Sequence, residues 1–507
     1  MSSDSRPRRG RRLLLVLVSV VTSLALAIAG GVTWVYVEAT VSTVGSAEFR
    51  NELAIPPLAP SRIAPDGTRT FELEMRSGRR EFLPRSATET WGFNGDHLGP
   101  TLRARRGEKV AVTVRNNLTE ASTVHWHGMH LPAAMDGGPH QTVAPGATWT
   151  PNWSVDQPAA TLWYHPHPHG ATEDHVRRGL AGMFLLDDDV SSALPLPATY
   201  GVDDLPVIVQ DVKFNGAAFD SAHAIFRDVG FLGDRTMVNG TLTPYRNVGD
   251  ELIRLRLLNA STARTYTFEF ADQRPFALIA TDGGLVERPI TLDRLRLSPG
   301  ERGEIVVRMR PGERTVLRSG ELDAGLDFWT QRFSGGDDTF DILELRAAET
   351  LRPSPELPAT LAVPTVPDGT DSVRERHFDL DLSGINGTPM AMDRIDVAVT
   401  RGTAETWVVR NNDGMPHNFH IHDVRFRVLA VDDAPPPAAL TGAKDTVFLP
   451  PNVTVRLAMR FDGPADPDAP YMYHCHLLWH EDLGMMGQFV VVNPGETAGT
   501  PPPHHGH

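Results

Sequence analysis

The stretch at residues 473–486 reads YHCHLLWHEDLGMM and contains Cys475, the only cysteine of this 507-residue chain. Side chains on a β-strand alternate between its two faces, so His474 and His476 are expected on one face and Cys475 on the other. A single short strand of this kind can supply ligands to two metal sites. The pattern therefore favours a β fold organised around this strand.

The same stretch carries most of a copper-binding set. Cys475, His480 and Met485 follow one another at intervals of five residues and offer a thiolate, an imidazole and a thioether. With a second imidazole, these are the ligands of a blue-copper electron-transfer site, where sulfur favours Cu(I) and imidazole accepts Cu(II). The missing histidine must come from elsewhere in the chain. A buried free cysteine beside structural histidines is the alternative interpretation.

The sequence pattern after the N-terminal segment predicts an all-β fold. Residues 107–117 (GEKVAVTVRNN), 249–259 (GDELIRLRLLN) and 402–412 (GTAETWVVRNN) share one plan of glycine turn, strand and asparagine. They recur at about the length of one domain, which indicates three homologous β-sandwiches. We expect these domains at residues 70–190, 191–350 and 371–494, a tether at 41–69, a proline-rich linker at 351–370 and a disordered, histidine-containing tail at 495–507.

The N-terminus has the pattern of an export signal. Five arginines lie within residues 1–12, and residues 13–37 are almost wholly apolar and long enough to span a bilayer. Residues 1–40 are therefore expected to form a signal peptide or a membrane anchor, which places the protein in the periplasm or at the cell surface. Arg11 and Arg12 resemble a twin-arginine signal without its usual flanking residues. The sequence pattern does not decide whether this segment is cleaved off as a signal peptide or retained as a membrane anchor.

Composition narrows the class of protein further. Hydrophobic residues make up 41% of the chain and charged residues 22%, as in an ordinary globular protein. Lys and Arg number 48 against 63 Asp and Glu, a net charge of −15 that argues against a nucleic-acid partner. A single cysteine also excludes an intramolecular disulfide, so the thiol is available for chemistry.

Histidine clusters elsewhere in the chain supply further ligands. His-x-His pairs occur at His125 and His127, His165 and His167, His420 and His422, and His474 and His476, and His417 precedes the third pair. As buried polar groups, eight imidazoles would each need a hydrogen-bond partner, whereas metal ligation accounts for all of them. Zinc is the competitor, but a zinc site is closed at four ligands and gives the cysteine no role. Eight histidines divide into three, three and two, as in a three-copper cluster open to oxygen, and His417 then completes the blue-copper site.

In order and spacing, these four clusters resemble the copper-binding motifs of multicopper oxidases. The resemblance covers about residues 70–494 and implies three cupredoxin-like Greek-key β-sandwich domains of the laccase type. Residues 156–161 and 442–447 look most like bacterial copper-efflux oxidases and spore-coat laccases. The resemblance further implies copper as the cofactor, with one type 1, one type 2 and two type 3 ions per chain, and O₂ as the electron acceptor.

The resemblance implies a role for each ligand. Type 2 copper would be bound by His125 and His420, one type 3 copper by His127, His165 and His476, the other by His167, His422 and His474, and type 1 copper by His417, Cys475, His480 and Met485. No family role matches His97, His130, His140, His169 or His175. An axial methionine stabilises Cu(II), so we expect a lower type 1 potential than an apolar residue would give.

The expected chemistry joins the two copper sites. The type 1 site would take electrons one at a time, and Cys475 would pass them through the backbone to its neighbours, which bind the cluster where O₂ becomes water. Asp136 and Glu481 stand where related enzymes keep carboxylates as proton relays. The alternatives are that Asp136 is a turn residue before two glycines and that Glu481 is a surface acid.

The sequence leaves the reductant open. The first hypothesis is a laccase-like oxidase of phenols and aromatic amines, and the second is an oxidase of cuprous or other metal ions that serves copper tolerance. Asp413 and Met415 resemble the acid and thioether that cuprous oxidases place beside their type 1 site. Against this, Asp413 also fits a turn, and the Met-rich insertion of that subgroup is absent. A third hypothesis is a copper-free scaffold similar to the cell-division-associated relatives.

Overall fold

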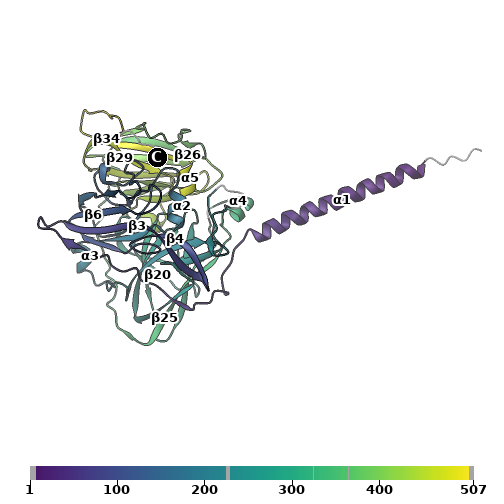
Figure 1. Ribbon diagram of the computed structural model, residues 1–507, viewed down its shortest axis with the longest axis horizontal. Helices are drawn as coiled ribbons and strands as arrows, with labels where there is room; N and C mark the ends of the chain where they lie inside the picture. The colour runs from purple at the N-terminus through teal and green to yellow at the C-terminus, as the bar shows by residue number, and fades with distance from the viewer. Residues whose placement is uncertain (1–6, 224–228, 324, 364, 502–507) are drawn as a thin grey trace, which may run out of the picture.

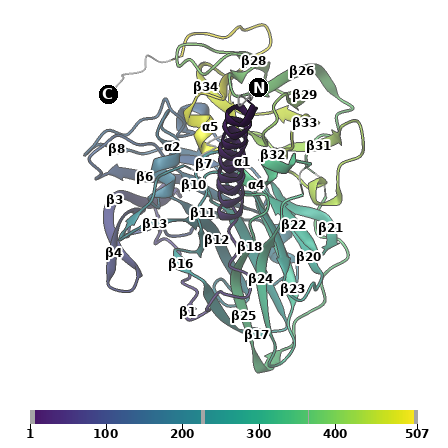
Figure 2. The same ribbon diagram turned by 90° about the vertical axis from the view of Figure 1, so that its right-hand side faces the viewer.

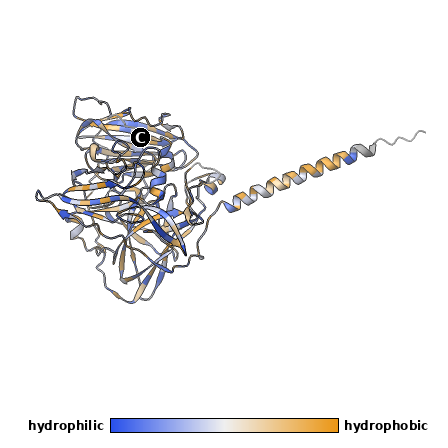
Figure 3. Cartoon of the chain, viewed as in Figure 1, coloured by the Kyte–Doolittle hydropathy of each residue, from blue (hydrophilic) through white to orange (hydrophobic). Residues whose placement is uncertain are grey.

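Three β-sandwiches and one long helix make up the computed structural model, which describes residues 7–223, 229–323, 325–363 and 365–501 (Figure 1). The predicted all-β fold and the N-terminal apolar helix are confirmed. Helix α1 (Pro7–Glu38) projects from the body and is apolar along most of its length (Figure 3). Residues 502–507 of the expected tail lie outside the described residues.

The first domain packs two sheets around a core that includes Phe71, Trp126, Tyr164 and Phe184. Its larger sheet contains β2 (Arg62–Ile63), β3 (Arg69–Leu83), β6 (Lys109–Asn116) and β8 (Thr148–Trp149), with β4 (Ser86–Phe93) on β3 and β9 (Asn152–Ser154) on β6. Its smaller sheet runs in the order β5 (Leu102–Arg105), β11 (Gly182–Asp187), β10 (Ala160–His165) and β7 (His125–His127).

The second domain is built in the same way around Leu255, Tyr266, Phe268 and Ile305. One sheet has the order β16 (Thr241–Leu242), β15 (Arg235–Val238), β12 (Asp204–Val212), β18 (Leu252–Asn259), β23 (Arg302–Arg308), β20 (Phe276–Thr281) and β21 (Gly284–Leu292). The other has the order β1 (Asn51–Glu52), β17 (Pro244–Asp250), β25 (Phe340–Arg352), β24 (Arg314–Gly320), β19 (Tyr266–Phe270) and β22 (Arg294–Leu297). A small hairpin joins β13 (Phe214–Asn215) to β14 (Ala218–Phe219).

The third domain closes the body around Trp407, Phe419, Phe461 and Phe489. Its first sheet has the order β27 (Gly384–Ile385), β26 (Ser372–Asp381), β29 (Thr403–Asn411), β33 (Thr454–Phe461) and β31 (Phe426–Val431). Its second has the order β28 (Val397–Thr400), β35 (Met486–Val492), β34 (Asp466–His474), β30 (His417–Ile421) and β32 (Thr446–Leu449). Short helices in the described chain are η1 (Ala133–Met135), α2 (Thr172–Arg177), α3 (Asp189–Ala193), α4 (Phe328–Phe333), η2 (Ala438–Leu440) and α5 (Leu478–Asp482).

The internal repeat marks the same element in each domain. Strands β6, β18 and β29 each pair in parallel with an earlier strand of their own domain. Each ends at a buried asparagine whose side-chain amide donates to backbone carbonyls beyond the strand: Asn116 to Glu120 and Val143, Asn259 to Arg264 and Leu297, and Asn411 to Met415 and Leu449. These amides satisfy carbonyls of loops that have no ladder partner, which explains why the motif ends in asparagine.

The segment at residues 41–69, expected as a tether, is packed onto the body. Strand β1 pairs in parallel with β17 of the second domain, and β2 pairs with β3 of the first. The Val41 amide donates to Asp338 Oδ1 over 2.7 Å, directly after helix α1 ends. In the linker, Leu361 is buried, and its amide donates to the Glu287 carbonyl. The segment at 41–69 therefore contacts both the first and the second domain, and the linker contacts the second.

Candidate metal centre

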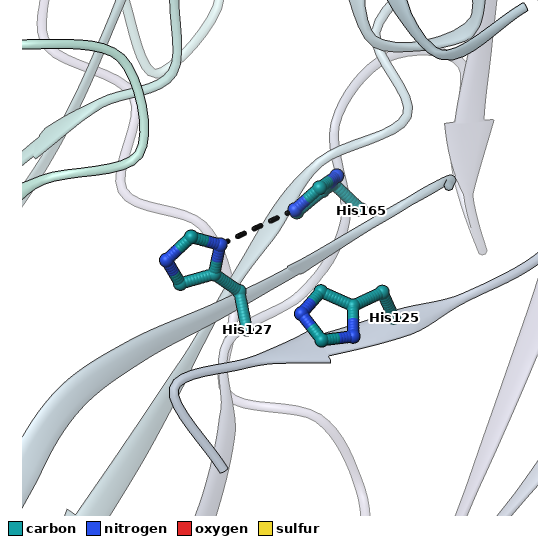
Figure 4. A group of neighbouring side chains, drawn as sticks. All are labelled: His125, His127 and His165. Carbon is teal, nitrogen blue, oxygen red and sulfur yellow. Dashed lines mark hydrogen bonds between the residues drawn. The ribbon is translucent and has the colours of Figure 1, made fainter. Parts of the chain in front are cut away.

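Eight buried histidines meet where the first and third domains face each other. Strand β7 pairs with the end of β10, which places His125 opposite His165, and β30 pairs with β34, which places His420 opposite His474. The partners His127, His167, His422 and His476 lie two residues further along. Figure 4 shows three of the rings gathered at the ends of β7 and β10. All eight side chains are at most 1% exposed.

Most of these rings are held by an oxygen atom at Nδ1. His125 Nδ1 lies 3.0 Å from the Asp136 carbonyl, His165 Nδ1 2.8 Å from the Pro166 carbonyl, His420 Nδ1 2.9 Å from the Asp445 carbonyl, and His474 Nδ1 3.1 Å from the Cys475 carbonyl. Because a carbonyl oxygen can only accept, Nδ1 carries the proton in each case and Nε2 carries a lone pair. This is how metal-binding histidines are usually oriented.

The Nε2 atoms are directed at one another. His125 Nε2, His420 Nε2 and both nitrogens of His476 are buried without a hydrogen-bond partner. His422 Nε2 and His474 Nε2 lie only 3.2 Å apart. His422 donates its Nδ1 proton to Asp136 Oδ2, so this is a contact between two lone pairs. Such a contact is unfavourable unless a cation lies between the nitrogens, and the donor set therefore fits bound metal.

The ligand groups overlap, as in a cluster of several ions. The potential ligand atoms of His167, His422 and His474 lie within 4.8 Å of one another, as do those of His125, His127 and His165, and of His125, His420 and His422. The His476 ring centroid is 4.9 Å from that of His127 and 5.2 Å from that of His165. Burial lowers the pKa of His127, His165, His420, His422 and His476 well below the ordinary value. Metal ligation requires these neutral rings.

A second, smaller group surrounds the cysteine. His417 Nδ1 and His480 Nδ1 lie 3.0 Å apart, and Cys475 Sγ lies 3.7 Å from the first and 3.6 Å from the second. Met485 is buried in the same core, and its carbonyl accepts the Cys475 amide proton. Burial raises the pKa of the Cys475 thiol to about 12. A bound cation would reverse this effect, because a thiol that coordinates a metal loses its proton.

Both carboxylates expected as proton relays touch the histidine cluster. Asp136 Oδ2 lies 2.6 Å from His422 Nδ1, and Oδ1 lies 3.5 Å from His125 Nδ1. Glu481 is 1% exposed, with its oxygens 3.3 Å from His167 Nδ1 and 3.2 Å from His474 Nδ1. Burial opposes ionisation of Glu481, but the two imidazoles outweigh it and lower the pKa of this carboxyl well below its usual range.

Burial and contacts bear on the alternatives for the two acids. Glu481 is not a surface acid. Asp136 does end a short helix before a glycine turn, yet its side chain points into the cluster. Gly137 has a φ of 82°, and a Cβ there would lie 1.8 Å from the Val124 carbonyl oxygen, so the turn requires glycine. The conformation of this turn thus orients the Asp136 carboxylate toward His422.

Comparison with known proteins shows the family. Sequence profiles described as multicopper oxidase match residues 74–191, 197–315 and 358–495. A multicopper oxidase of Staphylococcus haemolyticus is 34% identical over 89% of this chain and 94% of its own length. The chain belongs to the multicopper oxidase family. Its ligands are therefore expected to bind copper, and members of this family couple oxidation of a reductant to reduction of O₂.

Relatives of this multicopper oxidase differ in what they do. The cell division protein FtsP of Yersinia pestis is 36% identical over 87% of the chain and 92% of its own length. Among solved structures, the laccase-like multi-copper oxidase CueO of Ochrobactrum sp. is 35% identical with a TM-score of 0.79, covering 87% of this chain and all of that one. Overall likeness therefore leaves the specific activity open, and the site has to decide it.

Sequence reasoning missed an aspartate that orients two ligands. Asp445 Oδ1 lies 3.1 Å from His127 Nε2, and the Asp445 carbonyl accepts from His420 Nδ1. Arg302 of the second domain, fully buried, binds both carboxylate oxygens of Asp445 at 2.7 and 2.6 Å. A buried bidentate pair of this kind fixes the geometry of what it touches. The second domain thus orients the cluster through one arginine.

Asn418 was missed as well. It alternates with the ligands of β30, and its Oδ1 accepts the His476 amide proton at 2.5 Å and lies 3.6 Å from Cys475 Sγ. Its Nδ2 donates to Ser298 and Pro299 of the second domain. The signal in the sequence was a polar residue between two histidines on a strand, which predicts a second polar contact rather than a core position.

Breaking the ion pair is expected to weaken both fold and copper binding. Asp445→Asn removes the bidentate partner of the buried Arg302 guanidinium and leaves only the more distant Asp282 carboxylate, 3.8 Å away, which should destabilise the copper-free protein by about 3 kcal/mol. It also removes the anionic support of His127, which should lower copper affinity by about 10–100-fold. Urea unfolding and competitive copper titration measure the two effects.

A second buried arginine provides the control for this prediction. Arg264 lies between Asp211 and Asp338, with guanidinium nitrogens 2.9 and 2.7 Å from their oxygens, and neither acid contacts a histidine ligand within the described residues. Arg264→Met should therefore also destabilise the protein and leave copper affinity unchanged. Equal losses of affinity in both variants would show that Asp445 has no specific role at the ligands.

The remaining histidines have other surroundings. His130 Nδ1 lies 2.8 Å from Asp423 Oδ1, His140 Nε2 lies 2.6 Å from Gln488 Oε1, and His175 Nδ1 lies 3.0 Å from Ser122 Oγ. His97 is buried beside Phe82, and His169 is exposed. None of the five belongs to a group of potential ligands among the described residues, in keeping with the absence of a family role.

Proposed function

We propose that this protein is a laccase-like multicopper oxidase that oxidises phenols or aromatic amines one electron at a time and reduces O₂ to water. The observation that carries the proposal is the set of unprotonated ring nitrogens that face one another without partners at the cluster, beside a separate Cys–His–His group. A copper-free protein has no need for either arrangement, since each unpaired buried nitrogen costs free energy.

The proposal assigns four copper ions to twelve side chains. His417, Cys475, His480 and Met485 would hold the type 1 ion, His125 and His420 the type 2 ion, and His127, His165 and His476, with His167, His422 and His474, the two type 3 ions. Bound copper would accept and store single electrons and bind O₂. The spacing of ligand atoms supports two of these groups directly, that of His167, His422 and His474 and that of His417, Cys475 and His480.

The chain itself supplies the connection and the protons. Cys475 is joined by peptide bonds to His474 and His476, so the two groups of ligands are covalently linked through one strand end. Asp136 and Glu481 lie beside ligand imidazoles, where they can hold or pass protons without binding O₂ themselves.

Oxidation of a cuprous or other metal ion is the second candidate, and Asp413 favours it. Asp413 Oδ2 lies 3.4 Å from His417 Nε2, and the hydrogen bond with His417 lowers the pKa of this partly exposed carboxyl. An anionic oxygen against a type 1 ligand would suit a cationic donor. The same contact also serves to orient His417, whatever the donor is.

Two substrates and one variant separate these candidates. We expect the copper-loaded protein to oxidise a simple phenol without added Cu(II), and Asp413→Asn to slow phenol and Cu(I) oxidation by the same factor, because both reactions use the oriented His417. Steady-state rates with each donor, with and without Cu(II), give the comparison. If the variant loses Cu(I) oxidation alone, Asp413 is a metal-substrate ligand and the second candidate replaces the first.

The third hypothesis, a copper-free scaffold, is suggested by the likeness to FtsP. It predicts a protein that stays colourless when copper is supplied. The laccase-like proposal instead predicts a blue, copper-loaded protein with absorbance near about 600 nm from the Cys475–copper bond.

Export is supported by α1, whose residues 10–38 are long and apolar enough to cross a membrane.

A further inference from the structure

The C-terminal end of helix α1, where the helix joins the body, packs against α4 of the second domain. The Tyr36 ring stacks on Phe328 with centroids 4.8 Å apart and meets the edge of Trp329 at 5.7 Å. The Arg332 guanidinium lies 4.2 Å from the centre of the same Tyr36 ring. The apolar segment therefore has a specific contact with the folded body, which a signal that is only passing through the export machinery does not need.

The connection between α1 and the body is too short for free movement. The helix ends at Glu38, and by Val41 the backbone is already bonded to Asp338. Thr43 and Thr339 continue this pairing, since the Thr43 amide donates to the Thr339 carbonyl and the Thr339 amide to the Val41 carbonyl. If α1 spans a bilayer, the second domain must lie directly at its surface.

Aromatic side chains gather at this junction and remain exposed. Trp34 is 63% exposed, Phe328 64% and Trp329 50%, although all three are large and apolar. Tryptophan and tyrosine at the end of a spanning helix are typical of the lipid headgroup region, where amphipathic rings are most stable. Trp34 and Tyr36 hold that position on α1, and α4 extends the group onto the body.

The α4 region continues to the side that holds the Cys475 group. Leu322 and Leu326, just before α4, pack with Phe448 of β32, which pairs with β30 and so with the strand of His417. In Figures 1 and 2, α4 and α5 lie on the side of the body from which α1 leaves. Leu483, next to α5, is 55% exposed on the described surface.

We propose that α1 is retained as an anchor and that α4 rests in the headgroup layer of the bilayer, with Phe328 and Trp329 inserted. The partner of this surface is lipid. The body then lies on the membrane with its α4 and α5 side toward it, so donors reach His480 at the bilayer surface. Only this last consequence rests on the proposed function; the contact itself is independent of copper.

Site-directed labelling tests the contact in the full-length protein. Cys475 is the only native cysteine and is buried, so Trp329→Cys can be labelled alone with an environment-sensitive nitrobenzoxadiazole dye and reconstituted into phosphatidylcholine vesicles. We expect a blue-shifted emission that nitroxide-labelled lipids quench and aqueous iodide does not. Phe328→Cys, labelled in the same way, should give the same result and guards against a local effect of one substitution.

The matched control is Val190→Cys in α3, which is 53% exposed and lies on the far side of the body from α1 (Figure 1). Its label should emit as in water and be quenched by iodide alone. Labels at Trp329 and Phe328 that behave like the Val190 label would overturn the proposal. An intact mass of the membrane-extracted protein that lacks α1 would overturn it as well, and neither measurement depends on oxidase activity.

Discussion

Cys475→Ser is expected to remove the blue absorbance near about 600 nm and to lower phenol-driven O₂ consumption by more than about 100-fold, beyond the usual effect of losing an outer-shell contact. A serine hydroxyl does not replace the thiolate as a soft ligand. The fold should survive, because serine and cysteine are close in size and the exchange leaves the surrounding core residues in place. Visible spectra, an oxygen electrode and copper analysis measure the three consequences.

The Cys475→Ser experiment compares the loss of blue colour with the amount of copper that stays bound. The histidine cluster is untouched by Cys475→Ser, so most of the copper should remain bound while the blue colour disappears. Met486→Leu is the matched control, because Met486 is buried and pairs with His474 in the sheet but is not a proposed ligand. It should stay blue and active. A Cys475→Ser protein that remained blue would refute the assignment of the type 1 site.

Glu481→Gln and Asp136→Asn are each expected to slow O₂ reduction by at least about 100-fold while copper loading stays complete. Each amide keeps the shape of the acid but can no longer take up and release a proton beside the ligands it touches. Electron entry should be unaffected. Anaerobic reduction of the blue site by phenol should therefore proceed at the normal rate, whereas reoxidation by O₂ becomes slow in a stopped-flow experiment.

Asp482→Asn is the control for the Glu481 variant. Asp482 accepts the backbone amides of Thr172 and Glu173 at the start of α2 and has no recorded contact with a histidine ligand. Burial, together with the neighbouring Glu481 carboxylate, raises the pKa of Asp482 to about 8. Asp482→Asn keeps one oxygen that can accept from these amides and leaves every contact of Glu481 with the ligands in place. Unchanged reoxidation in Glu481→Gln, or an equal loss in Asp482→Asn, would contradict a specific proton relay.

The likeness to both oxidases and a cell division protein shows why the side chains decide function here. The matches to FtsP and to the Staphylococcus haemolyticus oxidase are nearly equal in identity and extent. Overall likeness therefore does not separate an oxidase from a protein of another function. The observations that bear on the difference are the buried imidazoles where the first and third domains meet, several of which have a ring nitrogen without a hydrogen-bond partner in the described chain.

Local spacing was enough to predict much of this protein. The expected strand through residues 474–476 was only partly correct, because β34 ends at His474 and Cys475 and His476 lie just beyond it. The recurring glycine-strand-asparagine plan predicted three domains before any contact was known, because it acts over a few residues, where backbone geometry dictates direction. The long apolar run from residue 13 onward predicted a spanning helix for the same reason.

Partners far apart in the chain were decided only by the tertiary structure. Arg302 and Asp445 are separated by 143 positions, and no periodicity in either segment indicates that they meet. Likewise, Tyr36 packs on α4 almost three hundred residues later, and the expected tether at 41–69 becomes part of two sheets. The sequence by itself determined which side chains offer metal-binding atoms and that they recur in closely spaced pairs. The fold determined how those ligands are oriented, because that depends on buried charges and ring contacts that form only when the domains pack together.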